Sequence, residues 1–180
     1  MVHGDLKGVR DCFKPRCATV STPTQPNILV DSSGRARITD FGLATVTRNL
    51  DSIRSASDDQ GHTARWTAPE ILNEEGTYSK EADIFSFAMV MIEVRYWRSA
   101  VCNASTYFRF ASMQVFTGAV PFHPSLPAAA MLAIMIGGRP PRPTHEALTS
   151  GLWRLMQRCW DQDRHLRPEI SEVLQALSGK

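Results

Sequence analysis

The sequence predicts a single, mainly α-helical domain with a small β-hairpin near its N-terminal end. A chain of 180 residues, 43% apolar and 21% charged, is long enough to bury one sizeable core. Two short runs of strand-forming residues, 28–30 and 36–39, flank the turn-rich tetrapeptide Asp-Ser-Ser-Gly at 31–34. Beyond residue 67 the apolar segments have helical length and are separated by Gly, Pro and polar links.

The second strand of this hairpin is expected to present a carboxylate at the edge of the sheet. Residues 35–40 alternate polar and apolar side chains, which predicts a half-buried strand ending at Asp40. Gly42 follows and allows the backbone to turn sharply. Residues 43–63 are polar and lack a sustained period, so we expect a mobile loop there.

Five helices are predicted after this loop. The segment 80–93 is apolar nearly all round and follows Ser79, a residue type that caps helices, so it should form the buried axis of the domain. Its apolar core spans eleven residues, well below the roughly 20 that a membrane span needs. The other predicted helices are 67–72, with Pro69 in the first turn, 127–136, ended by Gly137-Gly138, 148–160 and 168–177.

Composition and charge exclude several classes of partner. A formal net charge of +2 suits neither a dedicated nucleic-acid partner nor a membrane partner. The four cysteines lack metal-ligand spacing, which is typical of reduced thiols in a cytosolic protein. Charge at residues 3–5 argues against a signal peptide, so a cytoplasmic location is expected.

Four short motifs occur in a diagnostic order. They are His-Gly-Asp-Leu-Lys at 3–7, Asn27 at the start of a strand, Asp-Phe-Gly at 40–42 and Ala-Pro-Glu at 68–70. Together they resemble the catalytic half of a eukaryotic-type protein kinase. Asp-Leu-Lys is similar to Ser/Thr kinases, whereas Arg-Trp-Thr before Pro69 and the Cys-Trp pair at 159–160 are similar to tyrosine kinases. The mixture most resembles the tyrosine-kinase-like Ser/Thr group.

The resemblance implies a protein-kinase-like larger (C-terminal) lobe extending over residues 1–180, mainly α with a small β-hairpin. The sequence contains neither a Gly-rich phosphate-covering loop nor a Val-Ala-Ile-Lys strand, so the smaller lobe is expected to be absent. Nucleotide-binding groups of that lobe would then be missing.

The resemblance also implies catalytic and cofactor-binding roles. Asp5 would accept the proton of the substrate hydroxyl, and Lys7 would bind ATP and offset charge on the transferring phosphate. Asn27 and Asp40 would hold Mg²⁺ and contribute to nucleotide binding, because carboxylate and amide oxygens suit this hard cation. Considered singly, an Asp or Asn beside a strand is more often a turn former than a ligand.

Other matching positions would support the site. Thr67 would contact the substrate and bridge to Asp5 and Lys7. Gly4 replaces an Arg that in many kinases pairs with an activation-loop phosphate, so regulation by such a phosphate is not expected. The scaffold would comprise His3, Phe41, Gly42, the helix residue Asp83, which braces the catalytic loop, and Glu70 with Arg167, which form a buried ion pair.

Two segments interrupt the family pattern. Asp5 and Asn27 are 22 positions apart, and removing residues 9–25 restores the family spacing Asp-Leu-Lys-x-x-Asn. Removing residues 94–114 likewise yields Glu-Val-Phe-Thr-Gly-Ala-Val-Pro-Phe, similar to the family's Glu-Leu-Leu-Thr-Gly-x-x-Pro-Phe. Both segments begin with Val-Arg and end with Gln, which is compatible with GT…AG intron ends, so we hypothesise translated introns. The alternative is a pair of genuine surface loops, whose closure costs little entropy.

The family resemblance implies ATP-dependent phosphorylation of Ser or Thr in proteins, with ATP and Mg²⁺ as cofactors and a protein as substrate. Without the smaller lobe the positioning that provides most of the rate would be reduced, so this chain is expected to be impaired or inactive. The alternative is a non-catalytic interaction module or pseudokinase derived from a kinase. The sequence leaves the substrate and the oligomeric state open.

Overall fold

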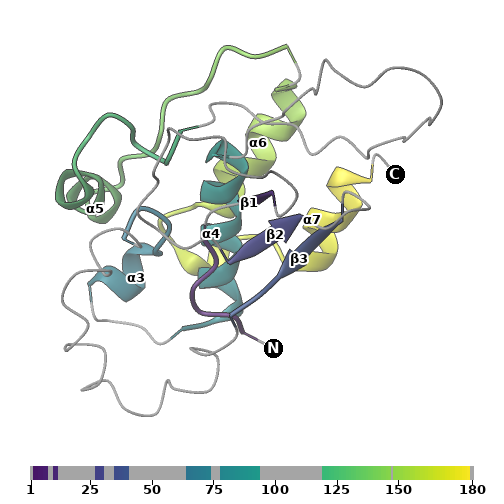
Figure 1. Cartoon of the computed structure of the whole chain (residues 1–180), viewed down its shortest axis with the longest axis horizontal. Helices are drawn as coiled ribbons and strands as arrows, with labels where there is room; N and C mark the ends of the chain where they lie inside the picture. Colours follow the sequence, from purple (N-terminus) through teal and green to yellow (C-terminus); the bar gives the residue numbers. More distant parts are fainter. Residues whose placement is uncertain are drawn as a thin grey trace.

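In the computed structural model, a mainly helical domain carries a small β-sheet at one side (Figure 1). Phe41, Gly42 and the predicted loop at 43–63 lie outside the described residues, as do residues 94–114 and all of 9–25 except 10–11. The structure describes residues 2–7, 10–11, 27–30, 35–40, 64–73, 78–93, 119–146 and 148–178.

The sheet contains the predicted hairpin strands and one short additional strand. Strands β2 (Ile28–Val30) and β3 (Ala36–Ile38) pair in antiparallel fashion with Ile28 opposite Ile38, which confirms their predicted pairing. Strand β1 (Arg10–Asp11) runs parallel to β2 and gives the order β1-β2-β3.

The predicted half-burial of the strand ending at Asp40 is wrong. All three residues of β3 are exposed, and Ile38 retains 49% of its surface. The reason is position, because β3 is an edge strand whose contacts with other described elements are those with β2. Polar–apolar alternation predicts burial only where a second layer packs against the apolar face.

Helix α4 (Lys80–Glu93) is the buried axis that the sequence predicts, with the predicted bounds. Phe85, Ala88 and Met89 are fully buried along it, and its remaining core positions contact the neighbouring helices. The Ser79 hydroxyl accepts a hydrogen bond from the backbone N–H of Ala82 at 3.3 Å and so caps the helix as expected.

The remaining helices surround α4. Helix α6 packs on α4 and on α7, whereas α3 contacts α5 (Figure 1). The predicted helix at 148–160 begins later than expected because the Thr149 hydroxyl caps its first turn by accepting from Leu152 N–H at 3.1 Å. The helices are α3 (Pro69–Leu72), α5 (Pro127–Met135), α6 (Ser150–Cys159), the 3₁₀ turn η2 (Arg164–Leu166) and α7 (Ile170–Leu177).

Helix α5 begins at Pro127 and is followed by Gly137 at a φ of +87°, a left-handed conformation that favours glycine. In the part of the chain that the structure describes, no helix combines the length and apolarity required to cross a membrane.

Candidate active site

The segment 2–7 is held against the N-terminal turn of α4 by one carboxylate. Asp83 Oδ2 accepts a hydrogen bond from the backbone N–H of His3 at 2.6 Å, and Oδ1 accepts from that of Gly4 at 2.9 Å. Because an ionised acceptor makes stronger hydrogen bonds than a neutral one, this two-point contact fixes the backbone immediately before Asp5.

His3 connects the same segment to the end of β3. Its Nε2 lies 2.9 Å from the carbonyl oxygen of Thr39, and its Nδ1 accepts from the backbone N–H of Asp5 at 3.2 Å. A carbonyl can only accept and an amide N–H can only donate, so the ring is the neutral tautomer with its proton on Nε2. His3 therefore orients the backbone of Asp5.

Asp5 occupies the centre of the site. Its Oδ2 receives the Lys7 ammonium at 3.0 Å and the Asn27 side-chain amide at 2.8 Å, and the same amide donates to the backbone carbonyl of Asp5 at 2.7 Å. The Lys7 and Asp5 side chains are only 7% and 10% exposed. The fold thus brings Asn27 directly onto Asp5 although 22 positions separate them in the chain.

The two oxygens of this carboxylate differ in their hydrogen bonding. Oδ1 is buried, and no group in the described ranges donates a hydrogen bond to it. Burial raises the pKa of Asp5 above its usual value, while the Lys7 charge and the hydrogen bonds from Lys7 and Asn27 oppose the shift. The result is a carboxylate held by one oxygen, with increased proton affinity and an unused acceptor on the other.

Asp40 lies at the end of the same sheet. The backbone N–H of the preceding Thr39 donates to the carbonyl of Asn27 at 2.8 Å. Asp40 therefore follows directly after a residue that is bonded to Asn27, the residue that contacts Asp5. Asp40 is exposed and has a φ of 59°, which is uncommon for a residue with a side chain.

The donor set at this edge suits a magnesium ion. Mg²⁺ is held in phosphoryl-transfer sites by one or two protein oxygen ligands together with substrate phosphates and water. The exposed Asp40 carboxylate and the Asn27 amide oxygen would be the oxygen donors of such a site, since the Asn27 nitrogen already donates to Asp5. Among the residues described, no three His, Cys, Asp or Glu side chains form a metal-binding group, so any all-protein cage would need further ligands.

A cavity of about 20 Å³ lies between the Gly4–Asp5 backbone, residues 66–68 and α4. Thr67, predicted to contact the substrate, lines this cavity together with Asp5 and Tyr78. Sequence reasoning missed Tyr78, because a lone tyrosine before a helix has no distinctive spacing.

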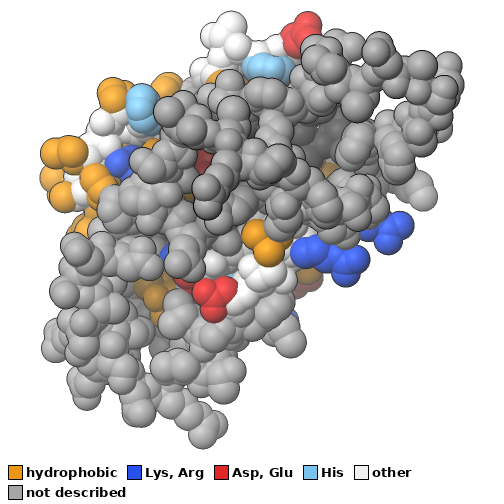
Figure 2. All heavy atoms as spheres, viewed as in Figure 1, with side chains coloured by type: hydrophobic (Ala, Val, Ile, Leu, Met, Phe, Trp, Pro, Cys, Tyr) orange, Lys and Arg blue, Asp and Glu red, His pale blue; other side chains and the backbone are white. Residues whose placement is uncertain are grey.

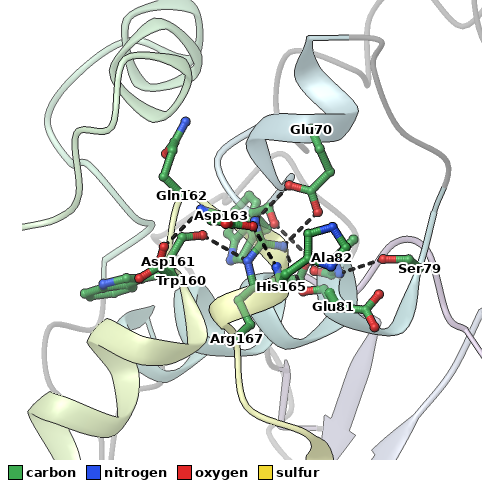
Figure 3. A network of polar contacts seen from close by, with 12 residues as sticks. Glu70, Ser79, Glu81, Ala82, Trp160, Asp161, Gln162, Asp163, His165 and Arg167 are labelled. Atoms are coloured by element: carbon green, nitrogen blue, oxygen red, sulfur yellow. Dashed lines mark hydrogen bonds and ion pairs between the residues drawn. The ribbon is translucent and has the colours of Figure 1, made fainter.

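Glu70 and Arg167 form an ion pair between α3 and the start of α7 (Figure 3). Their side chains meet in parallel, with Nη1–Oε1 at 2.7 Å and Nη2–Oε2 at 2.8 Å, and the Arg167 side chain is completely buried. Arg167 also donates to the backbone carbonyls of Glu81 and Asp161, both at 2.9 Å, and its guanidinium lies 5.1 Å from the centre of the Phe85 ring. This one side chain joins three parts of the chain.

Three further hydrogen bonds, absent from the sequence-based prediction, fasten residues 65 and 66. The buried Arg65 guanidinium donates to the carbonyls of Pro121 at 2.7 Å and Ser125 at 2.5 Å. The Trp66 indole N–H donates to Glu93 Oε2 at 3.0 Å. Burial raises the pKa of Glu93 to about 7, although this hydrogen bond opposes the shift. Only the folded chain places these side chains together, so no local sequence pattern indicates them.

Comparison with known proteins identifies the family. The model of the family described as protein tyrosine and serine/threonine kinase matches residues 24–177. Serine/threonine-protein kinase STY17 of Arabidopsis thaliana is 30% identical over 155 residues, which cover 84% of this chain and 22% of that protein. A putative serine/threonine-protein kinase/receptor of Acanthamoeba polyphaga mimivirus is 32% identical over 181 residues, covering 98% of this chain and 9% of the relative. Probable serine/threonine-protein kinase drkC of Dictyostelium discoideum is 31% identical over 154 residues, which cover 85% of this chain and 17% of that protein.

The chain spans no more than about a fifth of the length of these curated relatives. The family match begins after Asp5 and Lys7, so their place in the site rests on the folded contacts and on the motif at residues 3–7. The match nevertheless covers most of the chain, and the chain belongs to the protein tyrosine and serine/threonine kinase family.

Proposed function

We propose that this chain is the larger, C-terminal lobe of a protein kinase whose family function is ATP-dependent phosphorylation of Ser or Thr in proteins, and that the activity of the chain itself is impaired. The observation that carries the proposal is the Asp5 carboxylate, whose Oδ2 is held by Lys7 and Asn27 while the buried Oδ1 receives no hydrogen bond from the described residues. An unsatisfied buried acceptor costs free energy, about 1–3 kcal/mol or more, unless something binds it. A substrate hydroxyl is the donor that this family would bring there.

In this mechanism Asp5 Oδ1 accepts a hydrogen bond from the substrate hydroxyl and aims its oxygen. As that oxygen bonds to the γ-phosphorus of ATP, the bond from this phosphorus to the β-phosphate oxygen would break and ADP would leave. The hydroxyl proton passes to the Asp5 carboxylate, whose raised pKa favours acceptance. His3 and Asp83 hold the backbone that leads into Asp5 in one position.

Lys7 and the two candidate magnesium ligands would offset negative charge in the site. The Lys7 ammonium neutralises Asp5 in the structure described and lies where a cation could also approach negative charge developing on the substrate oxygen. Asp40 and Asn27 would hold Mg²⁺, which when bound supplies positive charge that offsets the phosphate oxygens of ATP. Thr67, beside the same cavity as Asp5, would contact the substrate.

Preference for Ser/Thr over Tyr is supported by Lys7 in Asp-Leu-Lys and by the names of the relatives, all Ser/Thr kinases. The Glu70–Arg167 ion pair would anchor the end of the activation segment to the helical core, since it fastens α3 to the turn before α7.

The experiment is phosphoryl transfer from γ-labelled ATP and Mg²⁺ to a library of Ser, Thr and Tyr peptides. Wild type is compared with Asp5→Asn, which keeps the shape of the side chain but cannot accept the proton. We expect incorporation into Ser or Thr peptides that falls by about 10²–10⁴-fold in the variant. Equal incorporation by both proteins would remove Asp5 from the mechanism, and label on Tyr alone would overturn the substrate preference.

A second candidate function is a non-catalytic, kinase-derived interaction module, and exposed apolar side chains support it. Leu126, Leu132 and Ile136, on and around α5, are 75%, 59% and 77% exposed, and apolar side chains gather where α5 lies (Figure 2). Thermal melting with and without Mg-ATP separates the two functions. A shift lost in Asp40→Ala supports a metal–nucleotide site, whereas a cooperative melt unaffected by Mg-ATP supports the interaction module.

We retain the proposal that residues 9–25 and 94–114 are translated introns, with surface loops as the alternative. Sequencing the spliced transcript decides the matter, because a message that retains both segments would eliminate the intron hypothesis.

A further inference from the structure

Tyr78 lies directly beside the backbone that carries Asp5. A Cβ atom built on Gly4 would be 3.4 Å from both Cγ and Cδ1 of the Tyr78 ring and 3.7 Å from its Cβ. The ring therefore stands about one methyl group away from the Gly4 backbone. Since Tyr78 immediately precedes the capped start of α4, its own position is fixed by the central helix.

Gly4 is held from two directions. Its N–H donates to Asp83 Oδ1 at 2.9 Å, and its φ of +80° is a left-handed conformation that glycine adopts without strain. The Tyr78 ring and the hydrogen bond to Asp83 both limit movement of the Gly4 peptide. Because Asp5 is the next residue, a shift of this peptide would move its carboxylate.

The ring also limits the space beside Asp5. Tyr78, Asp5 and Thr67 line the same cavity of about 20 Å³, which is room for about one water molecule. The side chains share an electrostatic environment, because burial and the negative charge of Asp5 both raise the pKa of the Tyr78 phenol. Replacing the ring with a methyl group would enlarge this cavity and release the Gly4 backbone.

We propose that Tyr78 is a positioning residue for phosphoryl transfer: its ring is the wall that holds the Gly4–Asp5 backbone in place and keeps the space beside Asp5 to about one water. The inference rests on the proposed kinase function, because it assigns Tyr78 a role only through Asp5. The role belongs to the ring, since the measured contacts with Gly4 involve ring carbons rather than the hydroxyl.

The test compares Tyr78→Ala, which removes the ring, with Tyr78→Phe, which removes only the hydroxyl. At a temperature well below melting, Tyr78→Ala is expected to lower kcat by about 10- to 100-fold and to leave KM for ATP within about twofold of wild type. Tyr78→Phe is expected to retain wild-type kcat. Trp153→Ala is the matched control, because it removes an aromatic ring from α6 at a residue that does not line the cavity.

Hydrogen–deuterium exchange gives a readout that needs no activity. The backbone amides of residues 3–5 are hydrogen-bonded to Asp83 and His3, so they should exchange faster in Tyr78→Ala but not in Tyr78→Phe or Trp153→Ala. If Tyr78→Ala does not melt cooperatively, Tyr78→Leu takes its place. The same increase in exchange and loss of kcat are then expected, with a smaller magnitude.

The outcomes separate this inference from the proposed function. A wild-type chain that neither transfers phosphate nor is stabilised by Mg-ATP refutes the proposed function, and the exchange experiment then decides alone whether the ring holds the Asp5 backbone. Unchanged exchange of residues 3–5 in Tyr78→Ala overturns the inference. An equal loss of kcat in Tyr78→Phe also overturns it, because the hydroxyl and not the ring would then be responsible.

Discussion

Glu93 provides the sharpest physical test of the structure. Its carboxyl is buried at the C-terminal end of α4 and accepts a hydrogen bond from the Trp66 indole at 3.0 Å. Burial raises its pKa from 4.5 to about 7. Glu93→Gln keeps an oxygen that can accept from Trp66 but removes the titration, so the variant isolates the cost of the buried charge.

The sign and size follow from linkage. Because the folded protein holds the Glu93 proton more tightly than the unfolded chain, the stabilisation is complete below pH 4.5 and is lost as pH rises through about 7. A shift of about 2.5 pKa units at about 1.36 kcal/mol per unit corresponds to about 3 kcal/mol, taken as an upper estimate. Relative to wild type, Glu93→Gln should therefore gain up to about 3 kcal/mol in free energy of unfolding between pH 4.5 and pH 8.

The assay is urea denaturation of both proteins at intervals from pH 4.5 to pH 8, because other titrating groups cancel in the difference. The control is Glu172→Gln. Its hydrogen bond with Arg158 lowers the pKa of Glu172, so the contribution of this pair is present above pH 4.5 and is lost only at lower pH; the Glu172→Gln difference should therefore stay nearly constant between pH 4.5 and pH 8. A Glu93→Gln difference that does not vary with pH would refute the burial of this carboxyl as the structure has it.

Four other changes test separate parts of the structure. Asp40→Ala should abolish any stabilisation by Mg-ATP in thermal melting while leaving the ligand-free melt nearly unchanged, because Asp40 is exposed; an undiminished shift would exclude it as a magnesium ligand. Glu70→Ala should lower the free energy of unfolding by about 3–5 kcal/mol, since it strands the buried Arg167 charge; a loss below 1 kcal/mol in urea titration would contradict the ion pair. Asp83→Ala should speed amide exchange at residues 3–4, which donate to its carboxylate, and unchanged protection would show that other contacts hold that backbone. Thr149→Ala should cost about 1 kcal/mol in urea denaturation through loss of the α6 cap, with Thr149→Ser close to wild type.

Elements with a strong local signal were predicted well from the sequence. Helix α4 has the predicted bounds because its apolar length and its Ser79 cap are both encoded within a few residues. The antiparallel pairing of β2 and β3 follows similarly from two strand-forming runs around a turn-rich tetrapeptide. The exposure of β3 was not predictable, because burial depends on whether another layer covers the strand.

The same distinction applies to the candidate site. The motifs at residues 3–7, 40–42 and 68–70 indicate which side chains could act, because motif order and spacing are properties of the chain. The contact between Asp5 and Asn27 has to be read from the folded structure, since a segment outside the family pattern separates them. Tyr78 and Glu93 escaped the sequence analysis because their environments come from residues elsewhere in the chain.

The family, the mainly helical class and the order of the elements could be predicted from the chain alone, since each depends on short stretches of residue types. The folded structure was needed to show that one Asp5 oxygen is held and that the other receives no hydrogen bond from the described residues, and that Tyr78 lies against Gly4. The physical reason is that burial, hydrogen-bond satisfaction and pKa depend on neighbours in space. The decisive ones are distant along the chain, with His3 and Asp83 80 positions apart and Glu70 and Arg167 97 apart.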